Sequence, residues 1–177
     1  MPQPSDLKRL IRSVPDFPKP GIVFRDITTL LKNGPALAEA AERLAAPFAH
    51  EKVDLVVGAE ARGFILGALA AYKLGAGFVP VRKPGKLPAD VIVETYSLEY
   101  GTDTLAMHRD AIRPGQRVLL VDDLLATGGT MAACCRMVEA LGGRIVGCAF
   151  LVDLTFLKGR EKLKPYRIVS LIEYDAE

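Results

Sequence analysis

The sequence predicts an α/β protein with a mostly parallel sheet of about five strands, flanked by helices. Two strand-loop-helix units lead to this prediction. The first runs from the apolar segment 53–57 to the helical segment 64–74, and the second from 118–121 to 131–141. Another apolar segment, 144–152, completes a β-α-β unit, for which a right-handed crossover is expected. Repeated units of this kind place the strands in parallel, with helices covering the sheet.

Composition restricts the possible classes of protein. A chain of 177 residues is enough for one domain, and we expect residues 1–177 to form it. The net charge of +2, without a basic run, gives no indication of nucleic-acid binding. No segment has the pattern of a secretory signal or a membrane span, so we expect a cytoplasmic protein without a membrane partner. Three cysteines without metal-ligand spacing should be reduced and mostly buried.

The N-terminal elements are expected to be short. Apolar residues at helical spacing predict a helix within 5–14, and the prolines that follow favour an extended segment over 16–21. Segment 22–27, taken alone, is typical of an edge strand packed on the core. A helix is expected from Asn33 or Gly34, because a proline in the first turn suits a helix start.

The middle of the chain should form a strand, a basic loop and a hairpin. A short strand at 77–81 leads into 82–88, where three cations are interrupted by Pro and Gly. This loop is either a solvated turn or an electrostatic clamp for an anion. Segments 92–97 and 102–107 predict a hairpin whose modest hydrophobicity suits a lid. Two further elements are expected, an exposed turn and helix at 158–162 and a strand at 168–172.

The strongest functional pattern is segment 118–130. Its strand is expected to end at Asp122 and Asp123, because a core does not accept unpaired carboxylates, and to deliver both acids to an edge or cleft. The next loop reads Ala126-Thr127-Gly128-Gly129-Thr130. Its glycines allow backbone N–H groups to converge on an anion at the start of a helix. Carboxylates accept hydrogen bonds from hydroxyls, so both halves together suit a ribose 5-phosphate.

Structural alternatives exist for several of these residues. Segment 122–130 could be an ordinary turn with a threonine N-cap and solvent-facing acids, although the adjacent acid pair disfavours this. Arg62, in a loop where α/β sheets bind ligands, is either a forked donor for pyrophosphate oxygens or one half of a surface ion pair. Taken alone, Glu99 is an ordinary surface acid and Leu154 a core residue.

Segment 121–130 resembles the 5-phosphoribosyl pyrophosphate (PRPP) motif of the type I phosphoribosyltransferases. Further motifs narrow the resemblance to the adenine-specific branch of that family and extend it from about Val14 to Lys162. They are Pro15-Asp16-Phe17-Pro18, Gly21-Ile22-Val23-Phe24-Arg25-Asp26-Ile27, Ala61-Arg62-Gly63-Phe64, Arg82-Lys83, Gly85-Lys86-Leu87-Pro88 and Tyr96-Ser97-Leu98-Glu99-Tyr100-Gly101.

The resemblance implies the type I phosphoribosyltransferase fold, with an N-terminal hood over 1–33 and a flap over about 92–108. The implied reaction transfers the 5-phosphoribosyl group from PRPP to N9 of adenine and gives AMP and pyrophosphate. Mg²⁺ is the implied cofactor, carried by PRPP without a direct protein ligand, and Asp122 or Asp123 could hold it through water. A homodimer, and a cis peptide between Glu60 and Ala61, are also implied.

The resemblance further implies which residues bind each part of the substrates. The ribose 5-phosphate group is bound by Asp122, Asp123, Ala126, Thr127, Gly128, Gly129 and Thr130. Adenine is bound, largely through main-chain groups, by Val23, Phe24 and Arg25, with Leu154 as a cap. Pyrophosphate is bound by Ala61, Arg62, Arg82, Lys83, Lys86 and Tyr100. Glu99 is the implied acid-base residue acting on the purine.

Other functions would keep the PRPP motif. Transfer to xanthine, hypoxanthine or orotate would change the hood, and Val23 to Arg25 argues against it. A PRPP-sensing regulator is disfavoured by the intact Glu99-Tyr100 flap and by the lack of an appended DNA-binding domain. A P-loop kinase is excluded because no Gly-x-x-x-x-Gly-Lys-Ser/Thr motif occurs.

Overall fold

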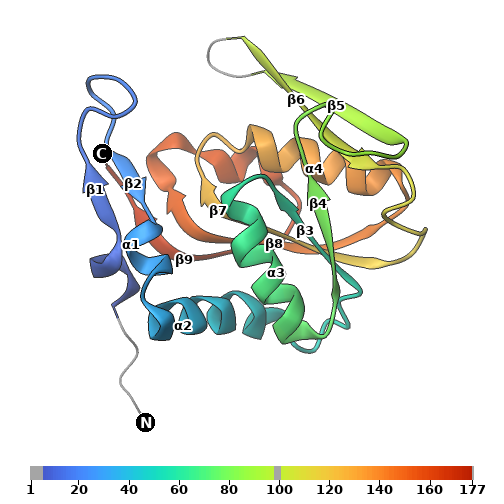
Figure 1. The fold of residues 1–177 in the computed structure, drawn as a ribbon, viewed down its shortest axis with the longest axis horizontal. Helices are drawn as coiled ribbons and strands as arrows, with labels where there is room; N and C mark the ends of the chain where they lie inside the picture. The colour runs from blue at the N-terminus through green and yellow to red at the C-terminus, as the bar shows by residue number, and fades with distance from the viewer. Residues whose placement is uncertain (1–5, 98–100, 177) are drawn as a thin grey trace.

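Figure 1 shows the computed structural model of the chain, which describes residues 6–97 and 101–176. Its centre is a parallel sheet in the order β4-β3-β7-β8-β9. The strands are β3 (Leu55–Ala59), β4 (Gly77–Val81), β7 (Arg117–Leu125), β8 (Arg144–Leu154) and β9 (Ile168–Tyr174). The predicted five-stranded parallel sheet is confirmed. Its order, which spacing does not reveal, places β7 in the centre.

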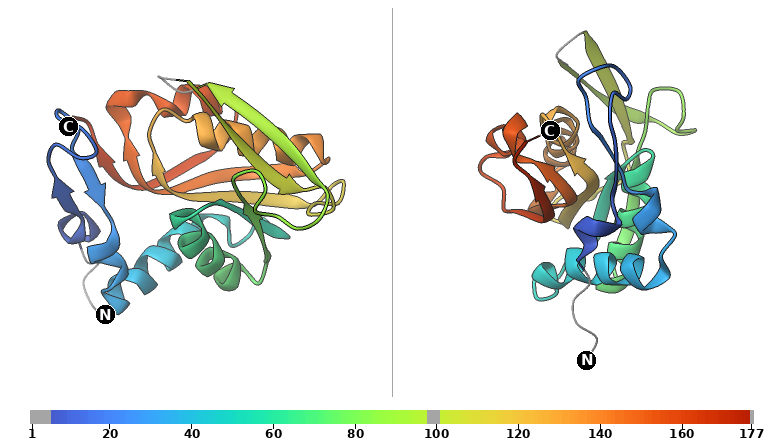
Figure 2. Two further views of the ribbon diagram at one scale, coloured as in Figure 1. Left: turned by 45° about the horizontal axis from the view of Figure 1, so that its top comes forward. Right: turned by 90° about the vertical axis from the view of Figure 1, so that its left-hand side faces the viewer.

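Helices cover both faces of the sheet (Figures 1 and 2). Helices α2 (Gly34–Ala45) and α3 (Arg62–Leu74) pack on one face, and α4 (Gly129–Ala140) packs on the other. Alternate strand residues face opposite sides, so β7 contributes Leu119 to the first core and Leu120 to the second. Helix α2 begins as predicted: the Asn33 side chain accepts a hydrogen bond from the Ala36 N–H, at 3.2 Å.

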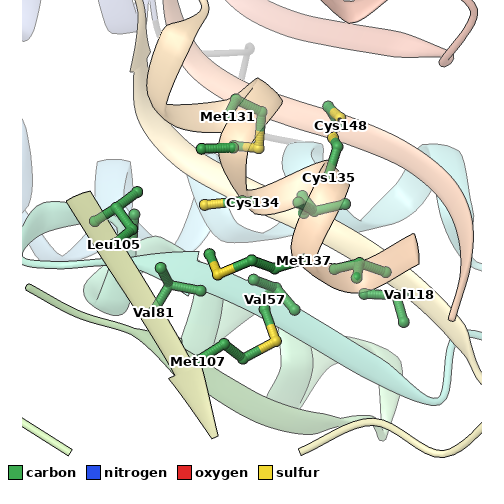
Figure 3. Close-up of a cluster of buried hydrophobic side chains, with 14 of the residues drawn as sticks. Val57, Val81, Leu105, Met107, Val118, Met131, Cys134, Cys135, Met137 and Cys148 are labelled. Carbon is green, nitrogen blue, oxygen red and sulfur yellow. Dashed lines mark hydrogen bonds between the residues drawn. The ribbon is translucent and has the colours of Figure 1, made fainter. Parts of the chain in front are cut away.

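The core under α4 is rich in sulfur (Figure 3). Met131, Cys134 and Met137 of α4 pack in one cluster with buried valines of the sheet. All three cysteines are free and buried, as predicted, and the Sγ atoms of Cys135 and Cys148 lie 3.9 Å apart. This apolar contact surface fixes α4, and therefore the loop before it, against the sheet.

An antiparallel hairpin extends beside α4 (Figure 1). It consists of β5 (Val91–Ser97) and β6 (Thr102–His108), which confirms the predicted hairpin. Leu105 and Met107 are buried in the α4 cluster, and Arg82 forms a backbone bridge with Ala106. Packing therefore anchors the base of this hairpin, which we call the flap, to both the core and the basic loop.

The N-terminal region differs from prediction. A 3-10 helix, η1, covers only Leu7–Leu10, and β1 (Arg12–Val14) pairs antiparallel with β2 (Phe24–Asp26). The predicted helix over 5–14 was too long because pairing with a distant segment gives Arg12–Val14 its extended conformation. A short helix, α1 (Thr28–Leu31), was not predicted. The β1–β2 sheet lies beside β9 (Figure 2), where the Arg25 guanidinium is 4.0 Å from the centre of the Tyr174 ring.

Three further 3-10 helices connect the larger elements. They are η2 (Ala46–Phe48), η3 (Thr155–Leu157) and η4 (Gly159–Leu163). The expected turn and helix at 158–162 is confirmed in outline, but Gly159 is buried rather than exposed, and the helix extends to the buried Leu163. None of the helices in the described residues is long and apolar enough to cross a bilayer.

Candidate active site

Strand β7 is longer than predicted, and this decides how it presents its acids. It continues through Asp122 and Asp123 to Leu125 because pairing with β8 persists as far as Leu125 and Asp153. Pairing with β3 on the other side ends at Val121. The expectation that the strand ends at the carboxylates was therefore wrong. The acids lie within the strand, at the point where one neighbouring strand has moved away and a cavity opens.

Both aspartates line one cavity of about 380 Å³. Asp122 and Asp123 are only 9% and 7% exposed, and the Asp123 N–H donates to Asp122 Oδ1 at 2.9 Å. Burial, followed by the neighbouring charge of Asp123, raises the pKa of Asp122 well above its ordinary value. The Asp122 carboxylate also lies against Gly63, where an added Cβ would be 2.7 Å from Oδ1. The cavity therefore joins the segment after β3 to the end of β7.

Residues 126–130, which we call the phosphate loop after the anion that they are expected to bind, form a second wall of this cavity. Helix α4 begins at Gly129, and its N-cap is Gly128 with φ of +80°, a conformation that glycine tolerates best. The alternative with a threonine N-cap is wrong. The first N–H groups of α4 consequently lie in the cavity wall, where the helix dipole favours an anion. Thr127 is exposed, whereas the Thr130 hydroxyl lies 3.0 Å from the Tyr96 hydroxyl.

The loop before α3 supplies the opposite wall through Glu60, Ala61 and Arg62. The peptide bond between Glu60 and Ala61 is cis, as expected. Arg62 Nε donates to Asp123 Oδ2 at 2.5 Å. The two interpretations of Arg62 are therefore compatible: it forms an ion pair, and its partner is an acid of the cavity. One guanidinium joins the two loops.

The basic loop lies outside the residues that line this cavity. Arg82 Nε donates to Glu60 Oε2 at 3.0 Å, and the Lys83 N–H donates to Glu60 Oε1 at 2.7 Å. The Lys83 ammonium pairs with Asp103 of the flap, and Arg82 also bonds the Lys86 carbonyl. These contacts lower the pKa of Glu60, chiefly through the Lys83 N–H, and that of Asp103, chiefly through the Lys83 side chain. Acids thus hold two cations of this loop near the cavity.

The four expected adenine residues are half-buried and do not line the same cavity. Val23 precedes β2, Phe24 and Arg25 lie in it, and Leu154 ends β8. The centre of the Phe24 ring lies 5.2 Å from the centre of the Phe17 ring and 5.4 Å from Cζ of the Arg62 guanidinium. The Arg25 side chain turns away to Ser13 and Tyr174. Phe24 therefore connects the N-terminal sheet to the cavity through Arg62.

Several contacts near the site were not predicted from the sequence. Tyr96 joins the flap to the phosphate loop, and Asp103 and Glu60 hold cations of the basic loop. Gly159 packs directly behind the phosphate loop. Sequence spacing could not show these contacts because each joins segments far apart in the chain. Glu99 and Tyr100 lie outside the described residues.

The acids of the cavity suit Mg²⁺ only in company with a substrate. Within residues 6–97 and 101–176, no three acidic, histidine or cysteine side chains form a group suited to a metal. Asp122 and Asp123 offer two carboxylates at one cavity. Mg²⁺ commonly binds through one or two carboxylates together with substrate phosphates, rather than in an all-protein cage. The residues present suit a magnesium ion that arrives with a phosphorylated substrate.

Comparison with known proteins identifies close relatives. The sequence profile of the phosphoribosyl transferase domain matches residues 27–176. Adenine phosphoribosyltransferase of Alkaliphilus oremlandii is 59% identical over 170 residues, which covers 96% of this chain and 99% of the relative. The matches therefore extend over nearly the whole chain.

Solved structures agree with these matches. The crystal structure of adenine phosphoribosyltransferase from Thermoanaerobacter pseudethanolicus has a TM-score of 0.93 and 55% identity, covering 96% of this chain and 98% of that one. The Giardia lamblia APRTase, solved in complex with 9-deazaadenine, has a TM-score of 0.90 and 40% identity, covering 96% of each chain. The fold is thus the one expected from the sequence motifs.

Proposed function

This chain belongs to the adenine phosphoribosyltransferase family, and from that premise we propose that its cavity binds PRPP for transfer of the 5-phosphoribosyl group to adenine. The products are AMP and pyrophosphate. The observation that carries this assignment is the Arg62–Asp123 contact, at 2.5 Å. It brings a cation suited to pyrophosphate and an acid suited to ribose hydroxyls to one cavity, beside a helix start suited to phosphate.

The 5-phosphate binds at the phosphate loop. Backbone N–H groups at the start of α4, with the hydroxyls of Thr127 and Thr130, are its donors. Asp122 and Asp123 accept hydrogen bonds from the 2- and 3-hydroxyls of ribose. These contacts hold the sugar still while the bond between its anomeric carbon and pyrophosphate breaks. The protein therefore acts mainly by placement and by stabilising charge.

Pyrophosphate binds to the backbone of Ala61 and to the cations Arg62, Arg82, Lys83 and Lys86. In the structure Arg62, Arg82 and Lys83 each contact a carboxylate. We infer that these acids hold the cations in position until the more highly charged pyrophosphate replaces them. Mg²⁺, carried by PRPP and held by Asp122 or Asp123 through water, would neutralise the charge of the leaving group.

Adenine binds between the hood and Leu154. Main-chain N–H and C=O groups of Val23 to Arg25 pair with its edge, and the Phe24 ring lies against its face. The orientation of Arg25 supports a main-chain role, because its guanidinium is directed to Ser13 and Tyr174. A 6-oxopurine would reverse donor and acceptor and leave buried groups unpaired.

Glu99 and Tyr100 are the two residues of the flap that we assign to the reaction. Glu99 exchanges a proton with the purine, and Tyr100 contacts pyrophosphate when the flap closes. Glu99→Ala is expected to lower kcat by about 10²-fold with little change in the KM values, in the range of a general acid-base residue. Steady-state kinetics would measure this, and an unchanged kcat would remove Glu99 from the role.

We also propose a cytoplasmic homodimer. Helix α3 exposes Ile65 and Tyr72, which are 41% and 83% exposed and lie two turns apart on one side of the helix that begins at Arg62. A second copy would cover this apolar face. The buried free cysteines suit a reducing compartment.

A panel of bases tests the function. The protein is incubated with PRPP, Mg²⁺ and either adenine, hypoxanthine, xanthine, guanine or orotate, and nucleotide and pyrophosphate are measured. AMP and pyrophosphate in equal amounts are expected from adenine. No AMP under any metal condition would overturn the assignment, and turnover of another base alone would indicate a different phosphoribosyltransferase.

A further inference from the structure

We propose that the turn at residues 158–160 positions the phosphate loop and thereby sets the affinity for PRPP. Gly159 is the central positioning residue, and Arg160 with Asp153 fixes the turn to the sheet. This turn is about thirty residues from the PRPP motif in the sequence and touches none of the substrate groups assigned above. The inference rests on the proposed binding of phosphate at residues 126–130.

The contact between the two segments is between backbones. A Cβ atom added to Gly159 would lie 2.2 Å from the Ala126 carbonyl oxygen and 3.1 Å from the Gly128 nitrogen. A Cβ added to Gly128 would lie 2.5 Å from the Gly159 carbonyl oxygen. Only glycines permit an approach this close from both sides. Because Gly128 is the N-cap of α4, moving the turn would also move the first N–H groups of that helix.

Strong polar contacts fix the turn. Arg160 Nε donates to Asp153 Oδ2 at 2.6 Å, and Arg160 Nη2 donates to Ser170 at 2.6 Å and Glu173 at 2.5 Å. These partners belong to β8 and β9. One guanidinium therefore ties the turn to two strands through charge-assisted hydrogen bonds.

Asp153 is unusual for a residue without a catalytic role. Its side chain is fully buried, and Oδ1 has no hydrogen-bond partner among the described residues. Arg160 is the cation that compensates its charge. The Arg160 side chain is 43% exposed, so solvent weakens its attraction to Asp153, and the pair compensates a buried carboxylate rather than adding much to stability. Holding the turn against the phosphate loop accounts for the pair better than stability alone.

The first experiment measures ribose 5-phosphate binding by calorimetry in wild type, Gly159→Ala and Gly34→Ala. Gly159→Ala must displace the loop, because the atom it meets is a backbone oxygen. We expect its affinity to fall by about tenfold or more, equivalent to about 1.4 kcal/mol. Gly34→Ala is the matched control, since no atom lies within 4 Å of its added Cβ, and it should bind like wild type. Wild-type affinity in folded Gly159→Ala would overturn the inference.

A second variant decides the question if Gly159→Ala does not fold. The double change Asp153→Asn with Arg160→Gln removes the ties of the turn to the sheet and leaves no charge buried at position 153 without its partner. We expect the KM for PRPP to rise about fivefold or more, with kcat and the KM for adenine within about twofold of wild type. An unchanged KM for PRPP, or an equal rise for both substrates, would contradict a positioning role. Wild-type protein that binds ribose 5-phosphate but forms no AMP would contradict the proposed function alone.

Discussion

At the scale of single residues, Asp122 and Asp123 are neighbours with different surroundings. Burial and the neighbouring charge of Asp123 raise the pKa of Asp122, and its Oδ1 accepts the Asp123 N–H. Asp123 forms an ion pair with Arg62, the first residue of α3, and both residues line the cavity. The two acids at this cavity therefore differ: Asp122 has a raised pKa, and Asp123 forms an ion pair with a cation.

Asp122→Asn should change how stability depends on pH. A carboxyl whose pKa is raised in the folded state binds its proton more tightly there than in the unfolded chain. Wild-type stability therefore falls as pH rises above about 3.8, the ordinary pKa, toward the raised value. The Tm of Asp122→Asn relative to wild type should accordingly increase from pH 4 to pH 8.

Thermal melts across this pH range measure the difference in Tm. Asp110→Asn, which changes an exposed acid outside the cavity, is the control. A difference between Asp122→Asn and wild type that is constant with pH would contradict the raised pKa.

Asp123→Asn should mainly weaken PRPP binding. The variant removes a charged acceptor for ribose hydroxyls and the partner of Arg62, so we expect the KM for PRPP to rise about tenfold, or about 1.4 kcal/mol. Stability should change by less than about 1 kcal/mol, because Arg62 is 42% exposed. Steady-state kinetics and thermal melts measure both effects. Glu51→Gln, which breaks the Arg117 ion pair, is the matched control, and unchanged kinetics in Asp123→Asn would remove it from the site.

At the scale of elements, the flap is joined to the phosphate loop by hydrogen bonds. Tyr96 of β5 is buried, and its hydroxyl lies 3.0 Å from Thr130 and donates to Asp103 at 3.2 Å. Burial raises the pKa of Tyr96, so the hydroxyl stays protonated and available as a donor. Asp103 in turn holds Lys83. The flap, the basic loop and the phosphate loop therefore form one connected network.

Tyr96→Phe tests this network. The ring would still pack, but the links to Thr130 and Asp103 would be lost, at a cost of about 1 kcal/mol each. We expect the KM for PRPP to rise severalfold and the Tm to fall. Tyr166→Phe is the control, because it loses a 2.6 Å hydrogen bond to Glu139 outside the network. Equal kinetic effects in both variants would show that the network is not coupled to PRPP binding.

At the scale of the whole molecule, the two faces of the sheet support different parts of the candidate site. The face under α4 carries the flap and the phosphate loop, and the face under α2 and α3 carries the N-terminal sheet. The cavity lies at the edge where both faces meet the ends of β3 and β7. Helix α3 belongs both to the cavity, through Arg62, and to the exposed surface, through Ile65 and Tyr72.

Tyr72→Glu tests the proposed dimer. The side chain is 83% exposed, so the change should not disturb the fold of one chain, whereas a charge buried in an apolar interface is costly. Sedimentation velocity is expected to show a dimer for wild type and a shift toward monomer for the variant. Leu157→Glu, at an exposed apolar residue outside α3, is the control and should remain dimeric. A wild-type monomer would contradict the proposal.

The sequence determined more about the ligand than about the geometry. The residue types in 122–130 predicted a site for a sugar phosphate, and the periodicity of the apolar segments predicted the parallel sheet and the hairpin. These features are local, because a strand, a helix cap and an anion-binding loop depend on residues a few positions apart. The same reasoning made β7 too short and the first helix too long, since both depend on strand pairing.

Which distant segments meet became apparent only in the folded chain. It placed β7 in the centre of the sheet, paired Arg62 with Asp123, linked Tyr96 to Thr130 and set Gly159 against Ala126. Each of the three residue contacts joins positions more than thirty apart in the chain, and the strand order depends on the pairing of whole segments. Spacing along the chain carries no information about such contacts because they arise from the packing of helices and strands on one another. The sequence thus identified the groups that we propose bind phosphate and sugar, and the packing fixed how those groups are held together.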